Sequence, residues 1–166
     1  MNDSFYEQFL KKKKTGADIL KQILLIWGLL LLSFIGFLFL GILFTVPAII
    51  LIYVYCSYLL PKTRQEYEYA LSNHYMDIAL IYNKEKRKDL MSIDLLKAEI
   101  IAPENSPKLS GFHPTKVHNF TSNAHQRDVY AVLFIQNTEL HKVLIEPDDR
   151  MLANIKNWSG SKFQAF

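Results

Sequence analysis

Histidines and one cluster of basic residues are the side chains of this sequence whose types and spacing could do chemistry. Three of the five histidines, His113, His118 and His125, lie close together along the chain. Zinc sites usually pair two ligands at close spacing, often with cysteine. These histidines are five and seven residues apart, and the single cysteine, Cys56, lies in an apolar stretch. We therefore keep them as candidate metal ligands, expect no bound cofactor, and take solvated loop histidines as the alternative.

Other catalytic patterns are missing from the sequence. The glycines outside residues 23–60 are Gly16, Gly111 and Gly160. They form neither a glycine-rich phosphate loop nor a Gly-x-Ser-x-Gly elbow. Glu66 and Glu68 alternate with tyrosines, so we interpret them as the polar face of a strand rather than as paired catalytic carboxylates. No catalytic residue is assigned, and the sequence favours a protein that is not an enzyme.

The basic cluster consists of Lys84, Lys86, Arg87 and Lys88. Such a cluster could contact phosphate or the headgroups of anionic lipid. The alternative is a solvated turn whose charges discourage pairing between sheet edges. The net charge of the whole chain is only +3, so we expect no nucleic-acid partner.

A long apolar stretch precedes these residues. Ile23 to Leu60 is 38 residues without Asp, Glu, Lys, Arg or His. One helix of this length would reach about 57 Å, whereas the hydrocarbon core of a bilayer is about 30 Å thick. We therefore predict two helices, Asp18 to Leu40 and Val46 to Leu60, with the interruption near Gly41 to Pro47. A buried hairpin of a soluble protein is the alternative.

Basic residues flank the apolar stretch on both sides, and its expected turn has none. Lys11 to Lys14 and Lys21 precede it, and Lys62 and Arg64 follow it. The positive-inside rule then predicts a multi-pass protein of the cell membrane with both termini in the cytoplasm. The expected order is a basic N-terminal segment (1–17), a transmembrane hairpin (18–60), a linker (61–64) and a cytoplasmic strand-rich domain (65–166). The N-terminal segment could also lie on anionic lipid as an amphipathic turn.

From Gln65 onward the apolar residues alternate with polar ones, as in strands. Turns are expected at Asn73-His74, at the charged run 83–89 and at Asn137-Thr138, with a loop over 103–114. Glu146-Pro147-Asp148-Asp149 is typical of a helix start and predicts a C-terminal helix over 147–158. The fold class expected is a membrane α-helical hairpin plus an α+β soluble domain. That domain is an antiparallel barrel or sandwich of about seven strands.

The order of about seven short strands and one C-terminal helix resembles bacterial pleckstrin-homology-like (PH-like) domains. An unspecific α+β sandwich is the alternative. A second resemblance rests on short motifs spread over most of the chain: Phe5-Tyr6-Glu7, Lys11 to Gly16, Tyr67-Glu68-Tyr69, Asp77-Ile78, Lys84 to Lys88, Ser92-Ile93-Asp94, Ile101-Ala102-Pro103, Glu146-Pro147 and Met151-Leu152. In these motifs the chain resembles a family of small two-span membrane proteins, a domain of unknown function, from Gram-positive anaerobes.

These observations predict a membrane-anchored interaction or scaffolding module that contacts membrane lipid and an unidentified protein partner. The resemblance implies an architecture and no reaction. Two alternatives stay open: an accessory subunit of a membrane transport or envelope complex, and a small metal-dependent enzyme that uses the loop from His113 to His125.

Overall fold

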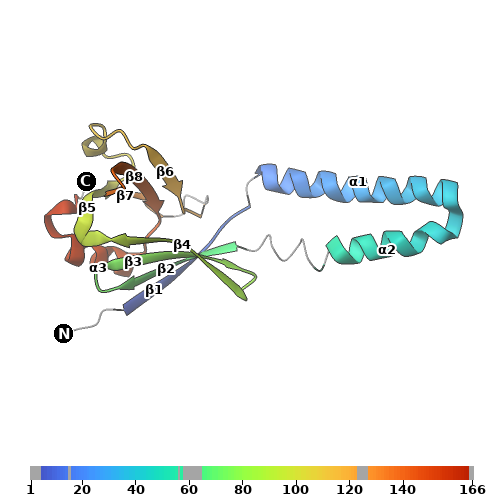
Figure 1. The fold of residues 1–166 in the computed structure, drawn as a ribbon, viewed down its shortest axis with the longest axis horizontal. Helices are drawn as coiled ribbons and strands as arrows, with labels where there is room; N and C mark the ends of the chain where they lie inside the picture. The colour runs from blue at the N-terminus through green and yellow to red at the C-terminus, as the bar shows by residue number, and fades with distance from the viewer. Residues whose placement is uncertain (1–4, 15, 56, 58–64, 123–126, 165–166) are drawn as a thin grey trace.

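A computed structural model describes residues 5–14, 16–55, 57, 65–122 and 127–164 of the chain. The described part consists of a helical hairpin, two four-stranded sheets and a C-terminal helix (Figure 1). The hairpin contains α1 (Gly16–Leu40) and α2 (Thr45–Val54). The first sheet has the order β1-β2-β3-β4, with strands Phe5–Lys11, Gln65–Ser72, Tyr75–Tyr82 and Lys86–Asp94. The second has the order β5-β7-β8-β6, with strands Ala98–Pro103, Tyr130–Gln136, Glu139–Ile145 and Lys116–Asn119.

The helical hairpin is inserted between two neighbouring strands of one sheet. β1 pairs antiparallel with β2, from Phe5 opposite Ser72 to Lys11 opposite Glu66. The chain leaves the sheet after Lys11, passes through α1 and α2, and re-enters it at Gln65 (Figure 1). The whole hairpin is therefore the connection between β1 and β2.

This pairing corrects the expected domain division. Residues 1–17 were expected to form a basic segment outside the strand-rich domain, and the domain was expected to begin at residue 65. Instead, Phe5–Lys11 is an edge strand of the first sheet. Its even-numbered residues face the core, where Leu10 and Gln8 are buried. With β1, the described part has eight strands rather than seven.

The break between the two helices lies where Gly41 and Pro47 predict it. A short 3-10 segment, Gly41–Phe44, joins α1 to α2, and Gly41 adopts φ +60°, which favours glycine. Pro47 is in the first turn of α2, where its missing N–H costs no hydrogen bond. α1 begins at Gly16 rather than at Asp18. The expected second helix runs to Leu60, but residues 58–60 lie outside the described residues.

The expected turns form where the sequence indicates them. Asn73, Asn137 and Thr138 adopt positive φ between paired strands. The charged run 83–89 is only partly a turn, because β4 begins at Lys86 and carries the rest of the run. A bulge between Ile78 and Ala79 shifts the register of β3 with β4.

The two sheets enclose one hydrophobic core to which both contribute, including Tyr69, Ile78, Ile101 and Val143. α3 (Asp149–Ser159) covers this core with Met151 and Ile155. Its N-cap is Asp148, whose carboxylate accepts a hydrogen bond from Met151 N at 2.8 Å. Leu109 and Phe112, from the loop after β5, cover a smaller apolar cluster on the other face of the second sheet.

Candidate functional site

The basic cluster predicted from the sequence lies at the tip of the β3–β4 hairpin. Lys84, Lys86, Arg87 and Lys88 are all exposed. Tyr82 pairs with Gln65 on one side and with Lys86 on the other. Because β2 begins at Gln65, the tip lies at the end of the sheet that joins the helical hairpin (Figure 1).

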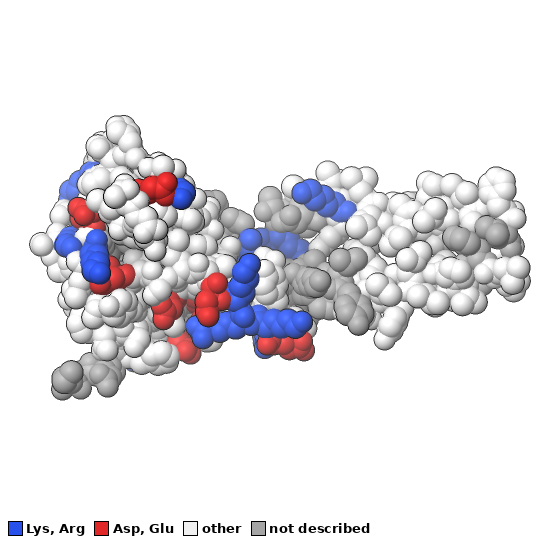
Figure 2. Space-filling view, viewed as in Figure 1, with Lys and Arg blue, Asp and Glu red and all other residues white. Residues whose placement is uncertain are grey.

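Lysines from the other side of the helical hairpin lie at the same end of the sheet. Lys12 Nζ lies 5.5 Å from the centre of the Tyr67 ring, and Lys13 N donates to Ser122 O at 2.8 Å. Lys14 Nζ donates to Oε1 of Gln22 on α1 at 3.2 Å. Figure 2 shows the basic side chains gathered around the junction between sheets and helices. We call Lys11–Lys14 together with Lys84, Lys86, Arg87 and Lys88 the basic rim.

Arg87 differs from the lysines of the tip because it is held by carboxylates. Its Nε lies 3.2 Å from Glu68 Oε2 and 3.4 Å from Asp89 Oδ1. Glu68 was expected on a solvent face, yet its side chain is only 7% exposed. Desolvation raises the pKa of Glu68, and the charge of Arg87 opposes that rise. Arg87 therefore neutralises a nearly buried carboxylate, whereas Lys84, Lys86 and Lys88 make no ion pair within the described part of the chain.

The three candidate metal ligands do not come together in the described residues. His113 is exposed in the loop before β6, and His118 is half-buried on β6. His125 lies outside the described residues. Among the residues that the structure describes, there is no group of three or more His, Cys, Asp or Glu side chains that could hold a metal ion.

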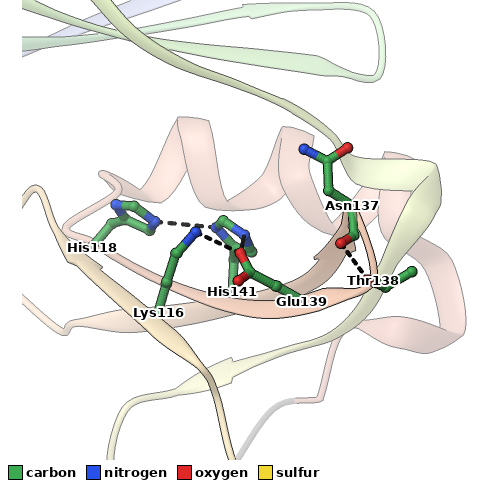
Figure 3. Close-up of polar contacts among 6 residues, drawn as sticks. All are labelled: Lys116, His118, Asn137, Thr138, Glu139 and His141. Atoms are coloured by element: carbon green, nitrogen blue, oxygen red, sulfur yellow. Dashed lines mark hydrogen bonds and ion pairs between the residues drawn. The ribbon is translucent and has the colours of Figure 1, made fainter.

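His118 instead pairs with His141, a residue that the sequence did not single out. His118 Nε2 lies 3.1 Å from His141 Nδ1 (Figure 3), and the rings are within 10° of parallel with centroids 5.3 Å apart. In this hydrogen bond one of the two nitrogens donates and the other accepts, so the two nitrogens cannot both carry a proton. The pair joins β6 to β8, and Lys116 and Glu139 form an ion pair beside it.

Acidification is expected to destabilise the domain through His118. Burial lowers the pKa of His118, and the nearby His141 and Lys116 lower it further. The unfolded chain therefore binds a proton at His118 more readily than the folded chain does. The contribution of neutral His118 to the stability of the fold is complete above about pH 6.5 and is lost as the pH falls below it. Thermal unfolding between pH 7 and pH 5 should show a fall in Tm that His118→Gln flattens. The exposed control His113→Gln should keep the fall; an unchanged slope in His118→Gln would contradict the assignment.

A second polar cluster is buried between the sheets and α3. Glu146, 1% exposed, accepts hydrogen bonds from Ser122 N at 3.1 Å and from Ser122 Oγ at 2.6 Å. Gln8 of β1 donates to Glu146 O and accepts from Asp148 N, both at 2.8 Å. Burial raises the pKa of Tyr69, whose hydroxyl donates to Phe120 O. The cluster links β1, β8 and the start of α3, so its geometry indicates a structural role.

A comparison with protein families agrees with the fold of the strand-rich part. A sequence model of the family described as "Bacterial PH-like domain (DUF6106)" matches residues 2–165. The match includes β1, the helical hairpin, both sheets and α3. Neither the curated proteins nor the solved structures searched contain a match.

Proposed function

The chain belongs to this family of bacterial PH-like domains, and from that premise we propose that it is a membrane-anchored interaction module without enzymatic activity. In this proposal the helical hairpin enters the membrane as a multi-pass anchor, and both termini and the PH-like domain stay in the cytoplasm. The observation that carries the proposal is the pairing of β1 with β2. Strands that share a sheet must lie on the same side of a membrane, so the segment between them has to return to the side it left.

The apolar character of the hairpin supports membrane insertion. Within the described residues, one stretch of 21 residues, Ile19–Phe39, is long and apolar enough to cross a membrane, and most of its large apolar side chains are exposed. Trp27 is 66% exposed and Phe39 is 85% exposed. An apolar surface of this extent is unfavourable in water and is satisfied by lipid. α2 is shorter, at 10 residues, which corresponds to about 15 Å.

The charge distribution supports the proposed orientation. The basic rim lies at the foot of the hairpin, that is, at the end where the helices join the first sheet. The 3-10 segment at the far end, Gly41–Phe44, carries no charge. Lys and Arg are retained on the cytoplasmic side of membrane proteins. They are also attracted to the anionic lipid of that leaflet.

Cysteine labelling tests the anchor. In a Cys56→Ser background, Leu43→Cys marks the far end of the hairpin and Ser110→Cys marks the domain; both positions are exposed. A membrane-impermeant maleimide applied to intact cells should label Leu43→Cys strongly and Ser110→Cys only after permeabilisation. Labelling of Ser110→Cys in intact cells would overturn the orientation, and no labelling at Leu43→Cys before permeabilisation would overturn the crossing.

Contact between the basic rim and lipid is expected to depend on the lysines of the tip. Each Lys near an anionic surface contributes about 1 kcal/mol, so Lys84→Gln, Lys86→Gln and Lys88→Gln together should remove about 3 kcal/mol. An environment-sensitive dye on Glu85→Cys in the Cys56→Ser background should report a polar environment in this triple variant in phosphatidylserine vesicles. Without the triple substitution it should report a less polar one.

The matched control for the lipid contact replaces Lys97, Lys142 and Lys156 with Gln. These lysines lie after β4, on β8 and on α3, outside the β3–β4 tip. This control changes the net charge equally and should keep the dye signal. Arg87 is left intact in both variants because it neutralises Glu68. Equal signals from both triple variants would show that the tip does not touch the lipid.

A further inference from the structure

The outer face of the first sheet is covered by no described element and has an unusual combination of side chains. Alternation along the strands directs one residue in two away from the core. The register aligns these outward residues in four rows across the sheet: Phe5, Ser72, Tyr75, Asp94; Glu7, Ala70, Asp77, Ser92; Phe9, Glu68, Ala79, Asp89; and Lys11, Glu66, Ile81, Arg87. We call this set the acidic face. It contains six acidic side chains and two basic ones, in a chain whose net charge is +3.

Among the described residues, half of these carboxylates have an ion pair and half have none. Asp94 lies within 4 Å of Lys97 and His74, whereas Glu68 and Asp89 share the single guanidinium of Arg87. Glu7, Glu66 and Asp77 have no ion pair within the described residues. Glu7 and Asp89 both raise the pKa of Glu68, so their fields overlap on it. With six acidic side chains against two basic ones, the face keeps an excess of negative charge.

Exposed aromatic rings accompany these carboxylates. Away from the helical hairpin, six large apolar side chains of the described part are exposed, and the three aromatic ones, Phe5, Phe9 and Tyr75, all belong to the acidic face. Between the rings the surface of the sheet is recessed, because Ala70 and Ala79 are small and buried. A groove of about 470 Å³ opens at the bulge of β3 and β4, lined in part by Asp77, Arg87, Asp89 and Ser92.

We propose that the acidic face is the docking surface for a basic segment of a partner protein, one that alternates Lys or Arg with apolar side chains. The carboxylates would pair with its charges, and the rings would cover its apolar residues. Charge complementarity selects this occupant over the anionic membrane, since an acidic surface is repelled by anionic lipid while the basic rim is attracted to it. This inference rests on the proposed function and names the chemistry of the partner.

Membrane anchoring argues against a second copy of the chain as the partner. Such a copy would have to pair its β1 edge antiparallel with the β1 edge of the first. Two copies in one membrane are related by an axis along the membrane normal. Such an axis preserves the direction of each strand along the normal, and β1 runs toward the foot of the hairpin (Figure 1). The two β1 strands would therefore run in the same sense along the normal.

Peptide binding to the full-length protein tests the proposal. The chain is placed in nanodiscs of phosphatidylcholine, which carries no net charge, and titrated against a fluorescein-labelled peptide of alternating Lys and Val. Fluorescence anisotropy should show saturable binding that weakens with salt. Glu7→Gln with Asp77→Asn, two carboxylates without an ion pair in the described residues, should raise Kd about fivefold or more, as expected for two lost charge pairs of about 0.5 kcal/mol each.

Controls separate the docking surface from general attraction. Glu99→Gln with Asp128→Asn removes two exposed acidic charges outside the acidic face and should leave Kd within about twofold of the original. Phe5→Ser with Phe9→Ser should also weaken binding. No saturable binding, equal Kd values for the two charge variants, or equal binding of a Glu-Val peptide would each overturn the proposal. Cysteine labelling of the hairpin is unaffected by these results, so a failed docking surface is distinguishable from a failed membrane anchor.

Discussion

A fragment of residues 65–166 is expected not to fold, although it contains every strand after the hairpin. It lacks β1, which pairs with β2 along seven residues. Burial of Leu10 is worth about 2 kcal/mol, and the two hydrogen bonds of Gln8 about 1 kcal/mol each. Together with the lost backbone hydrogen bonds between β1 and β2, the decrease in the free energy of unfolding exceeds about 5 kcal/mol. This is comparable with the total stability of a small domain. Amide resonances should be poorly dispersed and urea unfolding should show no cooperative transition.

Restoring β1 without the helices is the matched control. Lys12 N donates to Gln65 O at 3.0 Å, so residues 5–13 can be joined to residue 65 by a short Gly-Ser linker in place of the hairpin. This linked chain should unfold cooperatively in urea. If the fragment 65–166 alone were equally stable, β1 would be dispensable, and the same-side argument for the anchor would lose its basis.

Glu146→Ala is expected to destabilise the domain by about 3 kcal/mol. The substitution removes the carboxylate that accepts hydrogen bonds from the backbone N–H and the hydroxyl of the buried Ser122. Hydrogen bonds to a charged group contribute about 1.5–3 kcal/mol each, and two are lost. Urea unfolding of the full chain in detergent, followed by Trp158 fluorescence in a Trp27→Phe background, should show a midpoint at lower urea with little change in slope.

Two further variants define the origin of this loss. Glu146→Gln keeps one acceptor oxygen and should lose about half as much stability. Glu99→Gln removes an exposed carboxylate and should remain within about 0.5 kcal/mol of the original. A midpoint for Glu146→Ala equal to that of Glu99→Gln would show that the cluster contributes nothing to stability.

Local patterns in the sequence predicted the elements that depend on local physics. Asn73 and Asn137 tolerate positive φ and mark turns that the structure contains. Gly41 and Pro47 interrupt the apolar stretch where the helices are separated. The acidic start of the C-terminal helix became an N-cap at Asp148, which shifts the helix to Asp149–Ser159 from the expected 147–158. The PH-like fold followed from this order of elements, and the family match agrees with it.

Other features depend on which strands meet, and that is not encoded in short patterns. Phe5–Lys11 has too few residues to reveal its partner, which lies beyond the whole hairpin. β6 pairs parallel with β8, and only this register brings His118 beside His141. Glu68 has the sequence pattern of a solvent-facing residue, yet Arg87 reaches it from two strands away. In each case the deciding partner is distant along the chain.

The sequence alone determined that the chain has an apolar stretch long enough for two helices, followed by strands and one helix. Hydrophobic periodicity and turn residues determine the local structure of a few neighbouring residues. They can therefore be recognised in the sequence alone. The tertiary structure decided that this stretch is a connection within one sheet. It also decided that the basic rim lies at the foot of the hairpin and that the carboxylates share a face with exposed rings. These depend on strand register, which is fixed by packing between distant segments.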